Sequence, residues 1–272
     1  MDTKTIKKTN EPKPSEKTGC PNVLAINASP HRHTGNTAEI LNPFLEGMRA
    51  EGAAVELFCT EDLAINSCKG DLSCMIRPDG RCIHRDDMDE LIPKIRSADI
   101  LVLASPLYVD DVTGPMKTLM DRMVPLLQIF IETRDGHTRH PLKEVRMRRV
   151  ILVSSCGFWE LDNFDVLVAH MQAFAKNITA EFSGALLRPH AASLKGMLAL
   201  GAPVRDIPDA AREAGRQMVR ENRISPALLE TISRPLVPRD VYQQTSNQHF
   251  REMTLKIRQD AGKGPESQNG VP

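Results

Sequence analysis

Short apolar runs are spaced regularly along the first two thirds of the chain. They comprise residues 22–28, 54–59, 100–104, 150–155 and 181–187. In the first run, apolar residues occupy consecutive rather than alternate positions, which is typical of strands covered on both faces by helices. Such strands, each followed by a helical segment, predict a parallel sheet built from right-handed crossovers.

Between these runs, apolar residues recur three or four positions apart, which predicts helices. The predicted helices are residues 40–48, 86–97, 115–131, 164–174, 210–221 and 226–232. Pro43 lies inside the first of them, so we expect a kink or a late helix start there. The fold class is therefore α/β, a doubly wound five-stranded parallel sheet of strand order 2-1-3-4-5 with a helical C-terminal extension.

Three regions follow from this pattern. Residues 1–21 are rich in lysine and lack apolar periodicity, which predicts a disordered tail. Residues 22–200 hold the strands and form the main domain. Residues 201–272 form the extension, which ends in a polar stretch containing Tyr242, Phe250 and Ile257.

Composition narrows the possible partners. The 35 basic and 35 acidic side chains cancel, so no net charge favours nucleic acid or an anionic membrane. No segment is apolar over the length that spans a bilayer, and the N-terminus does not resemble a signal peptide. We therefore expect a cytoplasmic protein that acts on small molecules, without nucleic-acid binding or membrane insertion, and with its six cysteines reduced.

A polar loop between Ser29 and Thr37 follows the first strand. Because a helix begins directly after it, backbone N–H groups and the positive end of the helix dipole converge there, as in phosphate sites. The candidate phosphate ligands are Ser29, Arg32, Thr34, Gly35, Asn36 and Thr37. The loop matches neither the P-loop nor the dinucleotide-binding glycine pattern. A loop that merely caps the next helix is the alternative.

A second segment follows the third strand, with Ser105-Pro-Leu-Tyr108 leading into Gly114-Pro-Met-Lys-Thr-Leu-Met-Asp-Arg122. Together the two segments resemble the paired signature of the flavodoxin-like NAD(P)H-dependent flavin mononucleotide (FMN) reductase superfamily, near its iron-sulfur flavoprotein and multimeric quinone reductase branch. The resemblance implies a flavodoxin-like fold, an FMN cofactor and flavin-ring contacts. These contacts are Ser105, Pro106, Leu107 and Tyr108, with Val109 in the adjoining loop.

The resemblance extends to the loop after the fourth strand, Ser154-Ser-Cys-Gly-Phe-Trp-Glu160, which related flavoproteins place beside the flavin. The residues assigned to the cofactor here are Ser155, Cys156, Gly157 and Trp159. Trp159 could cover the flavin or simply pack in the interior. Cys156 has no recognisable histidine partner, so we interpret it as a pocket-lining residue rather than a nucleophile.

Three cysteines, Cys68, Cys74 and Cys82, resemble the cluster-binding segment of iron-sulfur flavoproteins. The resemblance is incomplete because Asp71 stands where that branch tends to have a cysteine. No fourth thiolate is evident nearby. We therefore expect a structural loop with no bound metal.

These observations predict an oxidoreductase that passes electrons from NADH or NADPH through FMN to a quinone, an azo or nitro compound, or another flavin. Its partners would be a small-molecule acceptor and further copies of itself in a homodimer or homotetramer. Three alternatives remain: an iron-sulfur flavoprotein, a flavodoxin-type electron carrier, and a flavodoxin-like regulatory module without flavin. No residue is assigned as a catalytic acid or base.

Overall fold

A computed structural model describes residues 20–262, with side chains described to residue 259. The predicted tail, residues 1–21, lies almost wholly outside the described residues. The central sheet contains β1 (Asn22–Asn27), β2 (Ala54–Cys59), β3 (Ile100–Pro106), β6 (Arg149–Ser155) and β7 (Glu181–Arg188). All neighbouring strands are parallel, in the order β2-β1-β3-β6-β7. Counted within this sheet alone, the predicted 2-1-3-4-5 order is confirmed.

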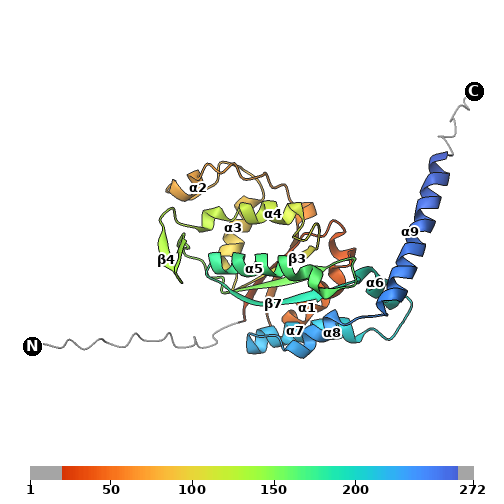
Figure 1. The fold of residues 1–272 in the computed structure, drawn as a ribbon. Helices are drawn as coiled ribbons and strands as arrows, with labels where there is room; N and C mark the ends of the chain where they lie inside the picture. Colours follow the sequence, from red (N-terminus) through yellow and green to blue (C-terminus); the bar gives the residue numbers. More distant parts are fainter. Residues whose placement is uncertain (1–19, 263–272) are drawn as a thin grey trace, which may run out of the picture.

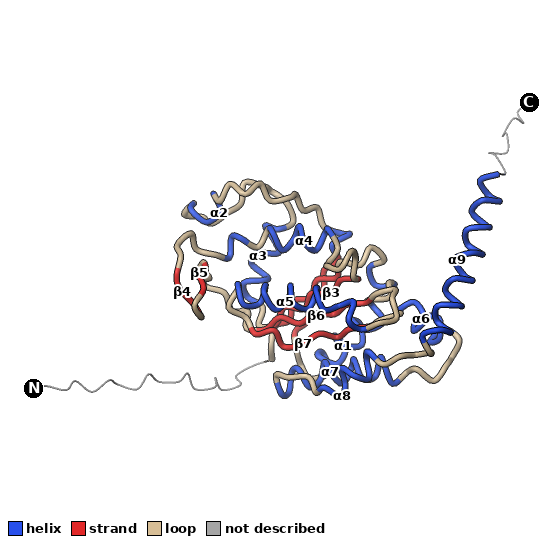
Figure 2. The backbone as a smooth tube through the Cα atoms, in the orientation of Figure 1, coloured by secondary structure: helices blue, strands red, loops and turns tan. Residues whose placement is uncertain are grey.

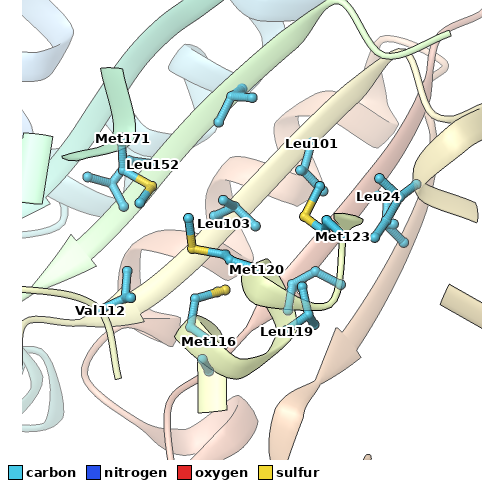
Figure 3. Close-up of a cluster of buried hydrophobic side chains, with 14 of the residues drawn as sticks. Leu24, Leu101, Leu103, Val112, Met116, Leu119, Met120, Met123, Leu152 and Met171 are labelled. Atoms are coloured by element: carbon cyan, nitrogen blue, oxygen red, sulfur yellow. The ribbon is translucent and has the colours of Figure 1, made fainter. Parts of the chain in front are cut away.

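Helices cover both faces of this sheet (Figure 1). One face carries α3 (Met88–Ser97), α4 (Gly114–Asp121) and α5 (Asp165–Asn177). Figure 3 shows the core on this face, where Leu101, Leu103 and Leu152 meet methionines from the helices. Methionine is unbranched and fills irregular gaps between helix and sheet. Consecutive strand residues thus serve opposite faces, which explains the unbroken apolar runs.

The opposite face carries α1 (Ala38–Ala50), α6 (Ala191–Ala199), α7 (Asp206–Glu221) and α8 (Pro226–Ser233). Helices α1 and α7 approach closely because glycines lie at their contact. A Cβ atom on Gly47 would lie 1.9 Å from the Arg212 carbonyl oxygen, and one on Gly215 would lie 2.0 Å from the Phe44 carbonyl oxygen. Helix α7, in the first part of the C-terminal extension, is therefore packed against α1, the helix that follows the Ser29–Thr37 loop.

Smaller elements complete the chain. Strands β4 (Glu132–Arg134) and β5 (His137–Arg139) form a separate antiparallel hairpin, and α2 (Ser73–Ile76) is one short turn (Figure 2). Helix α9 (Arg239–Gly262) projects from the body (Figure 1). The described part of the C-terminal extension, to residue 262, is helical, as predicted. None of the helices in the described part of the chain is long and apolar enough to cross a membrane.

Two helix predictions need correction. The predicted helix 115–131 ends at Asp121, and a 3-10 turn, Val124–Leu126, follows. Pro125 explains the early end, because a proline inside a helix clashes with the preceding turn and donates no hydrogen bond. Of the kink or late start expected for the first helix, the late start is wrong, since α1 begins at Ala38 and includes Pro43.

Candidate functional site

The three predicted loops meet at the carboxyl edge of the sheet, where β1, β3 and β6 end. The Thr37 and Ser155 hydroxyls lie 2.8 Å apart, which joins the first loop to the third. The Leu107 N–H donates to the Ser155 carbonyl at 2.8 Å, which joins the second to the third. Open α/β sheets bind their ligands at this edge, where the strand order reverses.

The Ser29–Thr37 loop, which we call the phosphate loop, is ordered by hydrogen bonds from nearby side chains. The Asn27 carboxamide accepts a hydrogen bond from the Ser29 N–H at 3.0 Å and donates one to the Arg32 carbonyl at 2.9 Å. Within the described residues, no hydrogen bond is made by the backbone N–H groups of Gly35, Asn36 and Thr37. These three donors stand at the start of α1, where its dipole is positive.

Gly35 fits this loop for a steric reason. A Cβ atom at this position would lie 2.5 Å from the Ser29 hydroxyl oxygen, closer than van der Waals contact allows. Ser29 and Thr37 are buried, whereas Thr34 is exposed and its hydroxyl donates to the His31 carbonyl. The structure thus brings the backbone and two hydroxyls together but gives the Thr34 hydroxyl a local partner.

Arg32, the basic side chain proposed to contact a phosphate in this loop, already has partners in this structure. Arg32 is paired with Asp62, its Nε lying 2.8 Å from a carboxylate oxygen, and it also donates to the Glu61 carbonyl. Instead, Lys195 of α6 reaches the loop and donates to the Thr34 carbonyl. Sequence reasoning missed Lys195 because it lies 161 positions from Thr34.

The segment from Ser105 to Arg122, which we call the ring segment, contains a tight turn. The Tyr108 N–H donates to the Asp111 carbonyl at 2.9 Å, and the Asp111 N–H donates back at 3.2 Å. Val109 and Asp110 have φ of 50° and 63°, the left-handed conformation that most side chains avoid. Val109 is 96% exposed at the tip. The turn therefore holds two non-glycine residues in a strained conformation, with an apolar side chain at its tip.

Buried hydroxyls hold the base of this segment. The Ser105 hydroxyl donates to the Pro106 carbonyl at 2.9 Å and accepts from the Thr113 N–H at 3.0 Å. The Thr113 hydroxyl donates to the Ala28 carbonyl at 3.1 Å, and the Ser154 hydroxyl to the Ser105 carbonyl at 2.7 Å. The Ser105 side chain is therefore occupied in positioning the segment, while Pro106, Leu107 and Tyr108 follow it along the edge.

A titratable pair stands next to the turn. The His170 Nδ1 lies 2.7 Å from an Asp111 carboxylate oxygen, which also accepts from the Val112 N–H at 2.7 Å. His170 belongs to α5, so this contact ties the ring segment to a helix. It is a second arrangement that no sequence motif indicated.

The third loop, which follows β6, is held by backbone hydrogen bonds to residues at and after the end of β7. The Cys156 N–H donates to the Arg188 carbonyl at 3.1 Å, and the Cys156 carbonyl accepts from the Ala191 N–H at 3.0 Å. Burial raises the pKa of the Cys156 thiol, which disfavours the thiolate. Cys156 is therefore not poised as a nucleophile. Gly157 is exposed beside it.

Trp159 lies in a group that we call the Arg188 cluster: Arg188, His190, Trp159 and Tyr242. The Trp159 indole stacks on His190 with ring centroids 6.2 Å apart, and its N–H donates to the Val237 carbonyl at 3.0 Å. The Tyr242 hydroxyl donates to the Gly157 carbonyl. Trp159 therefore joins the third loop to the C-terminal segment, which corresponds to the packing role weighed for it.

Arg188 is completely buried at the end of β7. Its guanidinium donates to the carbonyls of Pro189, Ile232 and Arg234 at 2.7–2.8 Å. Since Ile232 lies in the last turn of α8, the cation meets the negative end of that helix dipole. Burial, then the nearby Arg234, lowers the pKa of Arg188 to about 10, so it stays charged near neutral pH.

His190 is also completely buried, in a left-handed backbone conformation with φ 38°. Its Nε2 accepts the Leu236 N–H at 3.0 Å and lies 3.1 Å from Arg188 Nη2. Two donors at Nε2 require the neutral ring with its proton on Nδ1, which has no partner in the described structure. Burial and the Arg188 charge lower the pKa of His190 to about 4.

The cysteine loop is separate from these contacts. Asp71 uses both carboxylate oxygens locally, accepting from the Ser73 hydroxyl at 2.9 Å and the Ser73 N–H at 3.4 Å. Over residues 20–259, no three or more His, Cys, Asp or Glu side chains converge as ligands of a metal ion. The arrangement of Cys68, Cys74 and Cys82 does not fit a metal centre, and we derive no chemistry from one.

Comparison with curated proteins gives relatives over part of the chain. An iron-sulfur flavoprotein of Archaeoglobus fulgidus is 38% identical over 102 residues, which cover 38% of this chain and 45% of that protein. One from Methanocaldococcus jannaschii is 36% identical over 104 residues, covering 38% of this chain and 52% of the relative. The matched segments thus span about half the length of these curated relatives.

Solved structures share the fold at low sequence identity. A putative quinone reductase from Klebsiella pneumoniae has a TM-score of 0.55 and 16% identity, covering 76% of this chain and 93% of that one. An FMN-dependent NADH-azoreductase from Bacillus anthracis, solved with FMN, has a TM-score of 0.52 and 18% identity. That match covers 74% of this chain and all of the azoreductase.

One family profile matches residues 21–185, which include four strands of the sheet, the first part of β7 and all three loops. Its description is NADPH-dependent FMN reductase. The match takes in Ser29–Thr37, the ring segment and the Cys156 loop, which are the segments that converge at the sheet edge. The flavodoxin-like architecture and the profile agree, and the chain belongs to the NADPH-dependent FMN reductase family.

Proposed function

We propose that this protein binds FMN at the carboxyl edge of the sheet and transfers electrons from NADH or NADPH to a small-molecule acceptor. The acceptors that fit are a quinone, an azo or nitro compound, or a second flavin. The observation that carries the proposal is the unpartnered N–H array of Gly35, Asn36 and Thr37, at the start of α1 and next to two further loops of the same family signature.

The residues present fit a flavin phosphate. Three free backbone donors, the hydroxyls of Ser29 and Thr37 and the positive end of α1 form an anion site, and Gly35 leaves room for it. Lys195 would supply the positive charge that Arg32, already paired with Asp62, would supply less readily. The loop would hold the phosphate through many neutral donors and one cation.

The residues after Ser105 fit the ring. Ser105 and Thr113 hold the backbone in place, and the Tyr108–Asp111 turn presents Tyr108 and Val109 outward. When bound, FMN would supply hydride acceptance and onward electron transfer, while the protein positions the reactants and sets the electrostatic environment. Gly157 and the buried Cys156 would border the same site. His170, whose Nδ1 lies 2.7 Å from Asp111, is a side chain close to this edge that could exchange a proton.

The test is reconstitution with FMN followed by an anaerobic titration with NADH and with NADPH. We expect the oxidised-flavin absorbance to appear on binding and to bleach with at least one nucleotide. The Gly35→Ala variant should bind FMN at least tenfold more weakly, because the added methyl group collides with Ser29. Gly196→Ala is the control, since its Cβ would have no neighbour within 4 Å.

Other results of the reconstitution and titration would indicate a different function. Flavin that binds but stays oxidised would indicate an electron carrier, and absorbance beyond the flavin bands would indicate the iron-sulfur alternative. A protein that binds no FMN under any of these conditions would refute the proposal.

A further inference from the structure

A pocket beside the cysteine loop, residues 68–82, has no role in the proposed function. It has a volume of about 240 Å³ and lies between the end of this loop, α3 and the segment after α4. None of the residues assigned to the flavin lines it. Figure 2 shows the loop, with α2 in it, passing over the side of α3 and α4 that faces away from the sheet. Pockets for drug-sized ligands span roughly 300–1,000 Å³, so this pocket suits a smaller molecule.

Arg122 lines this pocket and has a free donor. Its side chain is only 2% exposed, and its guanidinium binds both carboxylate oxygens of Asp86, at 2.7 Å and 3.0 Å. The same guanidinium donates to the Asn66 carbonyl at 2.6 Å. Within the described residues, the Arg122 Nε has no hydrogen-bond partner. A buried N–H without an acceptor is costly, so a ligand that brings an acceptor into the pocket gains affinity from it.

The mouth of the pocket carries two further cations, Arg81 and Arg96. Both are exposed, and among the described residues their guanidinium groups make no hydrogen bond or ion pair. The two acids that line the pocket, Asp79 and Asp89, are each paired with an arginine outside it, at 3.5 Å and 3.7 Å. The cations that remain available therefore favour an anionic ligand, and a guanidinium suits a carboxylate in particular.

Cys82 places a thiol in the same pocket, where it is half-buried. It interacts directly with Arg122: burial lowers the pKa of Arg122, but the hydrogen bond to Asp86 and the neighbouring Cys82 outweigh burial and raise it. Reactive cysteines lie in electropositive and partly exposed surroundings, and Cys82 has both. Cys74, in contrast, is buried and does not line the pocket.

We propose that this pocket is a site of thiol–disulfide exchange, in which Cys82 reacts with a small disulfide that carries a carboxylate. The carboxylate meets Arg81 and Arg96 at the mouth, and an oxygen of the bound group can accept from the Arg122 Nε. The pocket thus selects the anionic disulfide and brings its sulfur to the thiol.

The exchange step is balanced by the disulfide itself. The Cys82 thiolate attacks one sulfur atom, a new S–S bond forms as the old one breaks, and the second half of the reagent leaves as a thiolate. The proton of the Cys82 thiol goes to solvent, and the leaving thiolate takes one up. Cys82 is thereby oxidised to the mixed disulfide, the released half is reduced to a thiol, and an excess of free thiol reverses the reaction.

The test compares three disulfides of similar size and different charge on the reduced full chain, without added flavin. They are 3,3′-dithiodipropionate, which has two carboxylates, neutral 2-hydroxyethyl disulfide, and cystamine, which has two ammonium groups. Peptide mass spectrometry follows the mixed disulfide at Cys82 and at Cys68, an exposed cysteine that does not line the pocket. We expect the ratio of the Cys82 rate to the Cys68 rate to be roughly fivefold or more higher with dithiodipropionate than with the neutral reagent, and lowest with cystamine.

Arg81→Gln with Arg96→Gln should remove this preference for the carboxylate and leave the rate ratio for the neutral reagent within about twofold of wild type. Arg251→Gln with Arg258→Gln, exposed positions on α9, is the matched control and should keep the preference. Equal ratios for the three reagents would overturn the proposal. So would a preference that survives the substitutions in the pocket, or a Cys82 that stays unmodified while Cys68 reacts. Because no flavin is present, these outcomes are independent of FMN binding.

Discussion

Acid should destabilise this protein through His190. The ring is neutral and fully buried, it accepts the Leu236 N–H, and the Arg188 guanidinium lies beside it. Protonation would remove the acceptor and place a second positive charge against Arg188. The folded protein therefore binds this proton less readily than the unfolded chain. Stability contributed by His190 is present above the unfolded pKa of about 6.5 and is lost as pH falls toward about 4.

The magnitude follows from the two pKa values. With about 6.5 unfolded and about 4 folded, His190 alone lowers the free energy of unfolding by about 2 kcal/mol between pH 7 and pH 5. Domains of this kind have only about 5–15 kcal/mol in total. The effect should therefore be measurable at pH values where carboxylates remain ionised.

Urea unfolding at pH 7, 6 and 5 measures it, with the fluorescence of Trp159 as the probe. Trp159 is the only tryptophan and stacks on His190. The control is His190→Gln, which cannot gain a charge. This variant starts less stable, because it lacks the imidazole contacts, but its stability should fall less on acidification. Wild type and variant curves that fall in parallel, within about 0.5 kcal/mol, would refute the assignment of the pH dependence to His190.

Two further substitutions test the site and the packing beneath it. Lys195→Met should weaken FMN binding roughly three- to tenfold, because it removes a cation from the phosphate loop, and added salt should reduce the effect. Fluorescence-quenching titrations measure the affinity. The control is Lys143→Met, because the Lys143 ammonium donates to the Cys74 carbonyl instead. Equal affinities for the two variants would show that Lys195 does not face the phosphate. Gly215→Ala should lower the free energy of unfolding by about 1–3 kcal/mol, because its Cβ would overlap the α1 backbone. In the same urea titrations Gly196→Ala, in open space, should stay near wild type or gain slightly, and equal losses in both variants would contradict the close α1–α7 contact.

Local patterns were sufficient to predict the sheet and the positions of its loops. The three central strands, β1, β3 and β6, are runs of mostly consecutive apolar residues that are buried on both faces. The Ser29–Thr37 loop could be proposed as a phosphate site because polar residues, a glycine and a helix start occur within nine consecutive positions. The backbone of this loop is held by local side-chain hydrogen bonds, such as those that the Asn27 carboxamide makes with Ser29 and Arg32.

The residues that sequence reasoning missed act over long separations. Arg188 binds carbonyls 44 and 46 positions away, and Lys195 reaches Thr34 across 161. No periodicity encodes such contacts, because they depend on how α6 and α8 are placed. Arg32 also has a partner that its sequence position did not indicate, because the loop after β2 brings Asp62 within 2.8 Å of its guanidinium. One sequence signal could have been used: Arg188 is a charged residue at the carboxyl end of a strand. An arginine is rarely fully buried unless it is paired.

The C-terminal part of the chain connects these observations. Helix α7 fixes α1 through Gly47 and Gly215, and the first turn of α1 presents the N–H groups of the phosphate loop. Residues 232–242 meet the Arg188 cluster, which fixes the loop that carries Cys156 and Gly157. Both sides of the proposed flavin site are therefore supported by residues beyond 200, outside the family profile. A change that loosens this region should reduce FMN affinity even though it touches none of the predicted ligands, and for Gly215→Ala the weaker binding should accompany the loss of stability.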